Sequence, residues 1–314
     1  MLGEGGGAKL LPSLHARAYE QKKNTDSTLY FHCAGNTYFL AFYCCAGNGR
    51  FLQSLFTRGI IVRQDIPALR SRFVGLFNYQ KLVSDPRFLT AFGKTILFTL
   101  ITVPSIMVVS LLLALLLQEK IHGVGIARAM VYWPSMISPI IIGIAWRWIL
   151  GYDTGILNYF LTLFHIDKQP WLIDNARAFI SVIVVSIWAQ TGFFMVIFIG
   201  GLNTIPDSYY EAARIDGANK WQQFSGITLP LLRPTTLLVL VLSTINAFKV
   251  YQLVTVLTSG GPGRATAFLV QNIYEEAFSK PLSVGYAAAQ SVVFFFVMLL
   301  LSIAQFKLSK EESV

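Results

Sequence analysis

Charged residues are scarce in this chain. They make up 13% of its 314 residues, whereas hydrophobic residues make up 54% and the mean hydropathy is +0.56. Soluble domains usually carry roughly 25% charged residues, so the composition excludes an ordinary soluble globular protein. It indicates a protein that lies in a membrane.

Cysteine and histidine are also rare. The three cysteines, Cys33, Cys44 and Cys45, have neither the paired spacing of a metal site nor the density of a disulfide scaffold. The four histidines are scattered over tail and loops, and no Ser/His/Asp or metal-binding grouping can be built from their spacing. We therefore expect no catalytic residue, no metal site and no enzyme activity.

The net charge of +9 raises the question of a nucleic-acid partner. The basic residues are spread along the segments that connect the apolar runs, and they do not form the dense tract typical of nucleic-acid-binding regions. Membrane topology explains this pattern better. We expect contact with a lipid bilayer and no contact with nucleic acid.

Five long apolar runs are present, and each is long enough to cross the roughly 30 Å of hydrocarbon in a bilayer, which takes about 20 residues as a helix. They cover 95–117, 130–150, 179–201, 235–258 and 282–306. Pro104 lies inside the first run, where it can kink the helix. The second run carries Trp146-Arg147-Trp148, and tryptophans are typical of the membrane interface, which favours an Arg147 that reaches the headgroups over one that binds a solute.

The first 72 residues fit this plan less well. Residues 1–28 are polar and basic and predict a flexible tail. Residues 29–72 are atypical, because a span over 29–46 has to accept His32 and Asn36. Two hypotheses stay open: a degenerate helix that still inserts, or an N-terminus altered by a reading-frame error, which an intact frame in the sequenced locus would exclude. The predicted fold class is all-α and polytopic, with five clear spans and one doubtful N-terminal span.

Residues 206–230 are polar and charged and lie between two of the apolar runs. Ser208 and Glu211 are spaced as a capping box and predict the start of a short helix, and Gly217 predicts its end. The small side chains of Ala212 and Ala213 allow a partner to approach the backbone closely. An ordinary amphipathic loop helix explains the pattern equally well.

A second helical piece is expected at 221–224, beyond which Pro230 and Pro234 limit helix continuity.

The same stretch resembles the EAA loop in the inner-membrane permease subunits of binding-protein-dependent ABC importers. The matching pattern is Glu211-Ala212-Ala213, then Gly217, then Ile227-x-Leu229-Pro230. Residues 73–88 (FVGLFNYQKLVSDPRF) and 257–266 (LTSGGPGRAT) resemble the carbohydrate-uptake branch, specifically the maltose-type first permease. The resemblance implies a helical ABC importer transmembrane domain over 73–307, with the coupling loop at 206–230 and a cytoplasmic tail at 308–314.

The resemblance also implies partners and a mechanism. The chain would be one of two similar permeases that work with two cytoplasmic ATPase subunits and an extracytoplasmic solute-binding protein. Together they would move a sugar or oligosaccharide across the cytoplasmic (inner) membrane by alternating access. The partner subunits would use ATP, and this chain would bind no cofactor. Glu211, Ala212, Ala213 and Gly217 would couple the ATPases to the movement of the helices.

Candidate solute contacts lie in the fourth apolar run. Asn246, Lys249 and Gln252 recur every three residues and are expected on one broad helical face, beside Tyr251. An intramembrane lysine is costly and by default indicates a functional site, and amides beside an aromatic ring suit the hydroxyls of a sugar. The alternative is that these groups only join helices by hydrogen bonds, or that Lys249 reaches an interface.

Counting the turns predicts the sides of the membrane. If the C-terminal tail is cytoplasmic, so are the 118–128 turn and the 206–230 stretch, whereas 151–177 is outside. The same count places the mixed polar connection at 63–94 outside, against its excess of basic residues, so its location stays open. The glycine-rich stretch 259–263 predicts a flexible or tightly turned outer loop, which could admit a docked binding protein or be a plain turn.

One apparent nucleotide motif is excluded. Gly93-Lys94-Thr95 has the end of a phosphate-binding loop, but the earlier glycine of that motif is replaced by Phe88 and no strand precedes it. The chain is therefore not expected to hydrolyse ATP.

Two rival functions remain at this stage. A secondary transporter or channel independent of ATPases explains Lys249 but not the spacing of the EAA residues. The other rival is that the chain is the non-functional product of a gene with an altered N-terminus. Whether the N-terminal span inserts into the membrane tests this second rival.

Overall fold

The computed structural model describes residues 54–55, 73–118, 123–279 and 283–311. The predictions for the tail at 1–28, for the doubtful span at 29–46 and for the three cysteines lie outside these residues, as does most of 29–72.

Between Phe77 and Glu311 the described residues form helices and the loops that join them, which confirms the all-α fold class. The bounds are α2 (Phe77–Ser84), α3 (Pro86–Leu117), α4 (Val124–Tyr132), the 3₁₀-helix η1 (Trp133–Met136), α5 (Pro139–Ile149), α6 (Ile156–Leu163), α7 (Asn175–Leu202), α8 (Asp207–Ile215), α9 (Lys220–Gln223), the π-helix η2 (Phe224–Thr228), α10 (Leu229–Leu231), α11 (Arg233–Phe248), α12 (Gln252–Leu257), α13 (Leu269–Tyr274), the π-helix η3 (Glu275–Ser279) and α14 (Val284–Glu311).

Three of these helices are each long and apolar enough to cross a membrane: α3, α7 and α14. They correspond to the runs predicted at 95–117, 179–201 and 282–306. The other two predicted spans are not single helices, and within the described part of the chain the number of spans reaches five only if each of two bent helix pairs counts as one.

α3 begins at Pro86, well before the predicted span at Thr95. The carboxylate of Asp85 accepts a hydrogen bond from the backbone N–H of Arg87 at 2.9 Å, and the proline occupies the first turn, where its missing N–H costs nothing. The polar connection predicted at 63–94 is therefore helical over Phe77–Ser84 and from Pro86 onward. At 1.5 Å per residue, the 32 residues of α3 extend about 48 Å, more than the roughly 30 Å of hydrocarbon.

The run at 130–150 is broken, which corrects the prediction of one span. The segment Val124–Met136 meets α5 at an angle of 99°. Two prolines explain the break: Pro134 lies in η1, and Pro139 starts α5 behind Ser138, whose hydroxyl accepts from the N–H of Ile140.

α7 packs closely against the backbone of α4. A Cβ atom placed on Gly192 would collide with the carbonyl oxygen of Val131 and with the Cα of Tyr132. Small residues allow this kind of approach between helices in a membrane. Gly200, on the same helix, has no such neighbour within 4 Å.

The run at 235–258 is also shorter as a helix than predicted. α11 ends at Phe248, and α12 starts separately at Gln252. On its other side, the segment Lys220–Leu231 meets α11 at 66°, which agrees with the predicted effect of Pro230 and Pro234.

The buried core joins helices that are distant in sequence. Phe98 of α3 packs on Phe268 with ring centroids 4.9 Å apart, and the N–H of Leu269 donates to the hydroxyl of Thr95 at 2.9 Å. Other faces of α3 leave large apolar side chains exposed, among them Leu100 and Leu116. Such faces suit lipid or a second membrane subunit.

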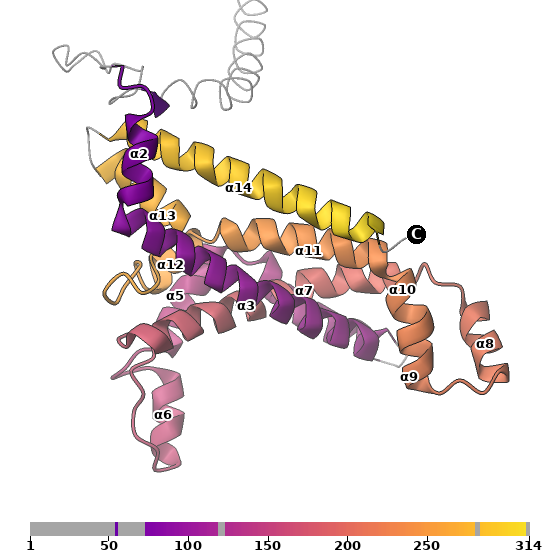
Figure 1. Ribbon diagram of the computed structural model, residues 1–314. Coiled ribbons are helices and arrows are strands. Elements are labelled where there is room, and N and C mark those ends of the chain that lie inside the picture. Colours follow the sequence, from indigo (N-terminus) through magenta and orange to yellow (C-terminus); the bar gives the residue numbers. More distant parts are fainter. Residues whose placement is uncertain (1–53, 56–72, 119–122, 280–282, 312–314) are drawn as a thin grey trace, which may run out of the picture.

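The two ends of the helix bundle are formed by different elements (Figure 1). α8, α9 and the end of α14 lie at one end, whereas α2, α6 and the 258–266 loop lie at the other. This arrangement agrees with the prediction that 206–230 and the C-terminal tail share one side of the membrane and that 151–177 lies on the opposite side. α2 lies at the same end of the bundle as 151–177. This is the side on which the count of turns places 63–94.

Candidate functional site

α8 projects from the end of the bundle, between the loop that follows α7 and the loop that leads to α9 (Figure 1). The helix begins at Asp207, after an extended Pro206, and no side chain caps it. The predicted capping box of Ser208 and Glu211 is therefore wrong, because both residues lie inside the helix. Asp207 supplies a negative charge to the first turn, where the helix dipole favours it.

Gly217 ends α8 as predicted. Its φ of +78° lies in the left-handed region, which glycine adopts without a steric cost. The N–H of Gly217 donates to Arg214 O at 3.2 Å, and the N–H of Ala218 donates to Ala213 O at 2.8 Å. These two bonds form a Schellman motif, which fixes the direction in which the chain leaves the helix.

The four predicted coupling residues lie together on this projection. Glu211, Ala212 and Gly217 are exposed, and Ala213 is half-buried. The structure places them where another protein can reach them, while their coupling role stays a prediction.

Apolar side chains on the same projection are unusually exposed. Tyr209 is 53% exposed, Ile215 87% and Trp221 72%. Exposed large apolar side chains beside charged ones, as on this projection, suit a surface that another subunit covers.

A hydrogen bond attaches α8 to the segment that follows it. The hydroxyls of Tyr210 and Thr228 lie 2.9 Å apart, and Thr228 is buried in the π-helix η2 directly before α10 and α11. A movement of α8 therefore has a direct route to the start of α11.

A groove of about 740 Å³ separates this projection from the bundle. Its walls come from the ends of α3 and α7 on one side, with Leu115 and Leu202, and from α8 and α9 on the other, with Tyr210 and Trp221.

Sequence reasoning missed the cap of α9. Asn219 accepts from the N–H of Gln222 at 2.9 Å, and the Gln222 side chain accepts from the N–H of Asn219 at 2.8 Å. The signal was present as an Asn-x-x-Gln spacing, which is a capping box of the same kind as the one expected at Ser208.

The four predicted solute residues lie at a break in the chain. Asn246 is in the last turn of α11, Lys249 is its C-cap, Tyr251 is the N-cap of α12 and Gln252 begins α12. The expectation of one continuous helical face is therefore wrong. Asn246, Lys249 and Gln252 are nevertheless all exposed, and their role in solute contact stays a prediction.

Tyr251 belongs to an aromatic row that the sequence reasoning did not find. Its ring centroid lies 5.2 Å from that of Tyr274, which lies 4.8 Å from that of Phe278. Tyr274 and Phe278 are 46% and 75% exposed. The four-residue spacing of Tyr274 and Phe278 is the sequence signal that could have predicted this pair. Tyr274 is the last residue of α13, and Phe278 lies in the π-helix η3.

The 258–266 loop is tightly turned, as one of the predicted alternatives holds. Thr258 and Thr266 share a hydrogen bond of 2.7 Å between their hydroxyls, and Gln271 donates to the carbonyl of Ser259 at 3.3 Å. Gly260 has a φ of +80°, in the left-handed region that favours glycine, and a side chain there would also meet the amide of Gln271.

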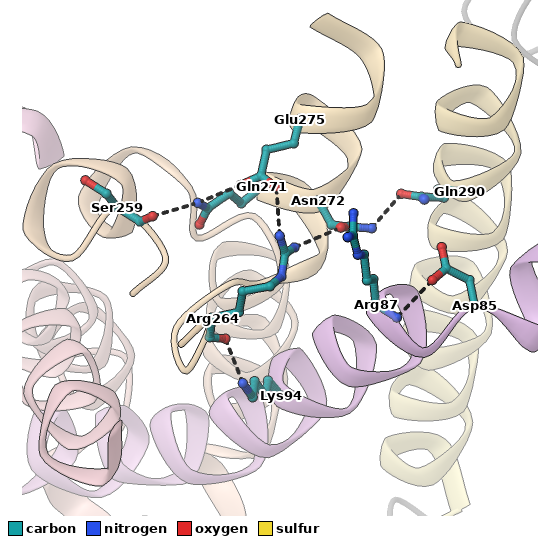
Figure 2. A network of polar contacts seen from close by, with 9 residues as sticks. All are labelled: Asp85, Arg87, Lys94, Ser259, Arg264, Gln271, Asn272, Glu275 and Gln290. Atoms are coloured by element: carbon teal, nitrogen blue, oxygen red, sulfur yellow. Dashed lines mark hydrogen bonds and ion pairs between the residues drawn. The ribbon is translucent and has the colours of Figure 1, made fainter. Parts of the chain in front are cut away.

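A polar network ties this loop to α3 and α13 (Figure 2). Arg264 forms an ion pair of 3.1 Å with Glu275 and donates to Asn272 at 3.0 Å, while Lys94 donates to the carbonyl of Arg264 at 2.7 Å. Asn272 in turn donates to Gln290 of α14 at 3.2 Å. The loop is thus held directly by α3, α13 and the π-helix η3, and α13 is in turn bonded to α14.

Within the described ranges, no group of three His, Cys, Asp or Glu side chains is placed to hold a metal ion.

Together, the long apolar helices and the polar segments at the two ends of the bundle define a polytopic membrane protein. The chain belongs to the family of binding-protein-dependent transport system inner membrane components, whose model matches residues 73–310. It is therefore the membrane-embedded permease component of such a system.

Several curated proteins are similar over most of the chain. The sn-glycerol-3-phosphate transport system permease protein UgpA of Agrobacterium fabrum is 35% identical over 247 residues, which cover 78% of this chain and 84% of that protein. The trehalose/maltose transport system permease protein MalF of Thermococcus litoralis is 34% identical over 241 residues, covering 76% and 80%. The probable ABC transporter permease protein YurN of Bacillus subtilis is 36% identical, covering 76% and 84%.

Solved structures show the same fold. A chain of a bacterial ABC transporter that imports the acidic polysaccharide alginate matches with a TM-score of 0.73 at 20% identity, over 93% of this chain and 99% of that chain. A second structure of a bacterial alginate transporter, in complex with an alginate-bound periplasmic protein, matches equally well, over 94% and 98%.

Proposed function

We propose that this chain is one of two similar permeases of an ATP-driven importer that moves a sugar or oligosaccharide across the cytoplasmic membrane. Two ATPase subunits would bind on the cytoplasmic side and hydrolyse the ATP, and an extracytoplasmic binding protein would deliver the solute. The chain itself would bind no cofactor.

The observation that carries the proposal is the α8 projection. It presents Glu211, Ala212 and Ala213 on a short helix, and it ends in a Schellman motif at Gly217. Its exposed apolar residues need a partner surface. The Tyr210–Thr228 bond connects the helix to the segment before α11, so that ATPase movement would reach the helices around the solute.

The same reasoning orients the chain. If α8 meets cytoplasmic ATPases, the end of α14 is cytoplasmic as well, because it lies at the same end of the bundle (Figure 1). The end that carries α6, the aromatic row and the 258–266 loop then faces the binding protein.

The solute class is supported by the names of relatives and by exposed polar and aromatic side chains. One relative is named for trehalose and maltose and another for sn-glycerol 3-phosphate. Exposed amides at Asn246 and Gln252, together with the aromatic row, suit a solute with many hydroxyls.

A pull-down from detergent-solubilised membranes tests the proposal. The tagged chain should recover an ATPase subunit, and Glu211→Lys and Ala213→Asp should each reduce that recovery. Asp153→Lys and Ala176→Asp are matched controls, since they make the same changes at exposed positions of the other end and should leave recovery unchanged. Absence of any ATPase from the unaltered chain would favour a secondary transporter or channel instead.

A further inference from the structure

A small pocket at the outer end of α3 is surrounded by positive charge. It has a volume of about 230 Å³ and lies between the first turns of α3 and the 263–267 stretch of the outer loop. Arg87 and Lys94 line it from the helix, and Arg264 lines it from the loop. Three cationic side chains thus meet at one cavity, two from the same helix and the third from a loop that is distant in the sequence.

Most of this charge is not neutralised. Arg264 forms an ion pair with Glu275, with side chains 42% and 36% exposed. Lys94 gives one of its three N–H donors to the carbonyl of Arg264. Among the described residues, neither Lys94 nor the guanidinium of Arg87 takes part in an ion pair. The nearby carboxylate of Asp85 accepts from Tyr286 and from the backbone of Arg87 instead.

The loop holds its cation in a defined place. Arg264 has a φ of +63°, a conformation that is uncommon for residues other than glycine and is kept only when surrounding contacts fix it. Those contacts are the bond from Lys94 to its carbonyl and the bonds from its guanidinium to Glu275 and Asn272 (Figure 2). In the same view, Arg87 rises from α3 toward the level of Asn272.

The pocket lies outside the hydrocarbon region. The uncharged run of α3, residues 95–117, is sufficient to cross the bilayer, so the preceding turns with Arg87 and Lys94 extend to the level of headgroups and water. The cationic groups therefore lie where a soluble or interfacial anion can reach them.

We propose that this pocket is an anion-binding subsite at the outer mouth of the permease, which takes a phosphate or carboxylate group. Arg87 and Lys94 would supply free N–H donors, with the fixed Arg264 beside them, and charge-assisted hydrogen bonds of this kind are the strong ones. The volume is below the roughly 300 Å³ of pockets that hold a whole small molecule, so the subsite would bind one acidic group of a larger molecule.

The anion can come from an acidic solute or from the headgroup of an anionic lipid. The inference rests on the proposed function only where it identifies the anion as part of a transported solute. Anion binding at the pocket itself needs no ATPase. Direct binding to the purified full-length chain therefore tests it separately from the pull-down.

Isothermal titration calorimetry with paired probes provides the test. Glucose 6-phosphate and galacturonate should bind the detergent-solubilised chain, while glucose and galactose, which lack the charge, should bind at least about 10-fold more weakly. Arg87→Gln should weaken binding of both anions by about 10-fold or more, and Arg87→Lys should retain most of it. Arg177→Gln removes the same charge from an exposed position at the same end and should have no effect.

A lipid arm separates the two sources. Native mass spectrometry of the chain in mixed phosphatidylcholine and phosphatidylglycerol would show retention of phosphatidylglycerol that Arg87→Gln removes, if a headgroup occupies the subsite. Either result supports an anion subsite and identifies its source. The inference is overturned if neither anion nor anionic lipid binds, or if binding does not change in Arg87→Gln and in Lys94→Gln.

Discussion

Tyr286, at the start of α14, donates a hydrogen bond of 2.6 Å to the carboxylate of Asp85, at the start of α3. The same carboxylate caps α3, and the ammonium of Lys81 lies 4.7 Å from the centre of the Tyr286 ring. These contacts join α2, α3 and α14 at the outer end of the bundle. They make the charge of Asp85 a structural element.

Asp85 predicts a dependence of stability on pH. Its burial raises the pKa of the carboxyl, but the hydrogen bonds from Tyr286 and from the backbone of Arg87 and Phe88, together with the charge of Lys81, lower the pKa below its ordinary value. A pKa lowered by folding stabilises the protein above the unfolded-state value of about 3.9. This contribution is lost as the pH falls through the lower, folded-state value.

Asp85→Asn should therefore lower the Tm of the detergent-solubilised chain at pH 7, and the difference from the unaltered chain should shrink below about pH 4. Asparagine is itself a good N-cap, so the substitution removes the charge and keeps the cap. Asp153→Asn, at an exposed position, serves as the control. A Tm difference that stays the same from pH 7 to well below pH 4 would contradict the assigned role of the charge.

Gly192 predicts a steric limit on the packing of α7. Gly192→Ala places a methyl group against the carbonyl of Val131, and overpacking of this kind costs about 1–3 kcal/mol. The measurement is the Tm and the yield of monodisperse protein after solubilisation. Gly200→Ala, where the added methyl meets nothing within 4 Å, should be neutral or slightly stabilising, because alanine has the higher helix propensity. Similar losses in both variants would contradict the role of the close contact.

Gly217→Pro should uncouple ATP hydrolysis from uptake without preventing membrane insertion. Proline fixes φ near −65°, whereas Gly217 has a φ of +78° and donates its N–H to Arg214, so the Schellman motif would be lost. Gly217→Asn is the matched control, because asparagine tolerates the left-handed conformation. Normal uptake by the proline variant in membrane vesicles would refute the coupling role.

Tyr210→Phe tests the route from α8 to α11. The substitution removes only the hydroxyl that bonds to Thr228, a loss of about 0.5–1.5 kcal/mol. We expect ATPase recovery in the pull-down to stay normal while uptake per ATP hydrolysed falls. Tyr209→Phe removes a hydroxyl from the neighbouring, more exposed ring and should change neither quantity.

The sequence was sufficient to predict the class of fold, the projection at 206–230 and the helix end at Gly217. A long uncharged run favours a membrane span, and glycine favours a helix end, through the properties of neighbouring residues alone. Both effects can therefore be predicted from the sequence. The start of α3 was not predicted, because the expected span was defined by apolar residues alone. The helix begins earlier, in a charged stretch that Asp85 caps.

Other features depend on contacts between distant residues. The break after Phe248 is invisible in a run that stays apolar to residue 258, and it moves Lys249 and Gln252 off a common helical face. The pocket of Arg87, Lys94 and Arg264 forms only when α3 meets the outer loop. No local pattern specifies such a meeting.

The most direct test of the central claim is uptake into proteoliposomes that contain the purified complex of this chain with its co-purifying subunits. Labelled maltose and trehalose serve as the first solutes, with the binding protein added outside and ATP enclosed. The account predicts uptake that requires both ATP and the binding protein and that Glu211→Lys abolishes, while Asp153→Lys retains it. Uptake at the same rate without ATP, or uptake unaffected by Glu211→Lys, would contradict it.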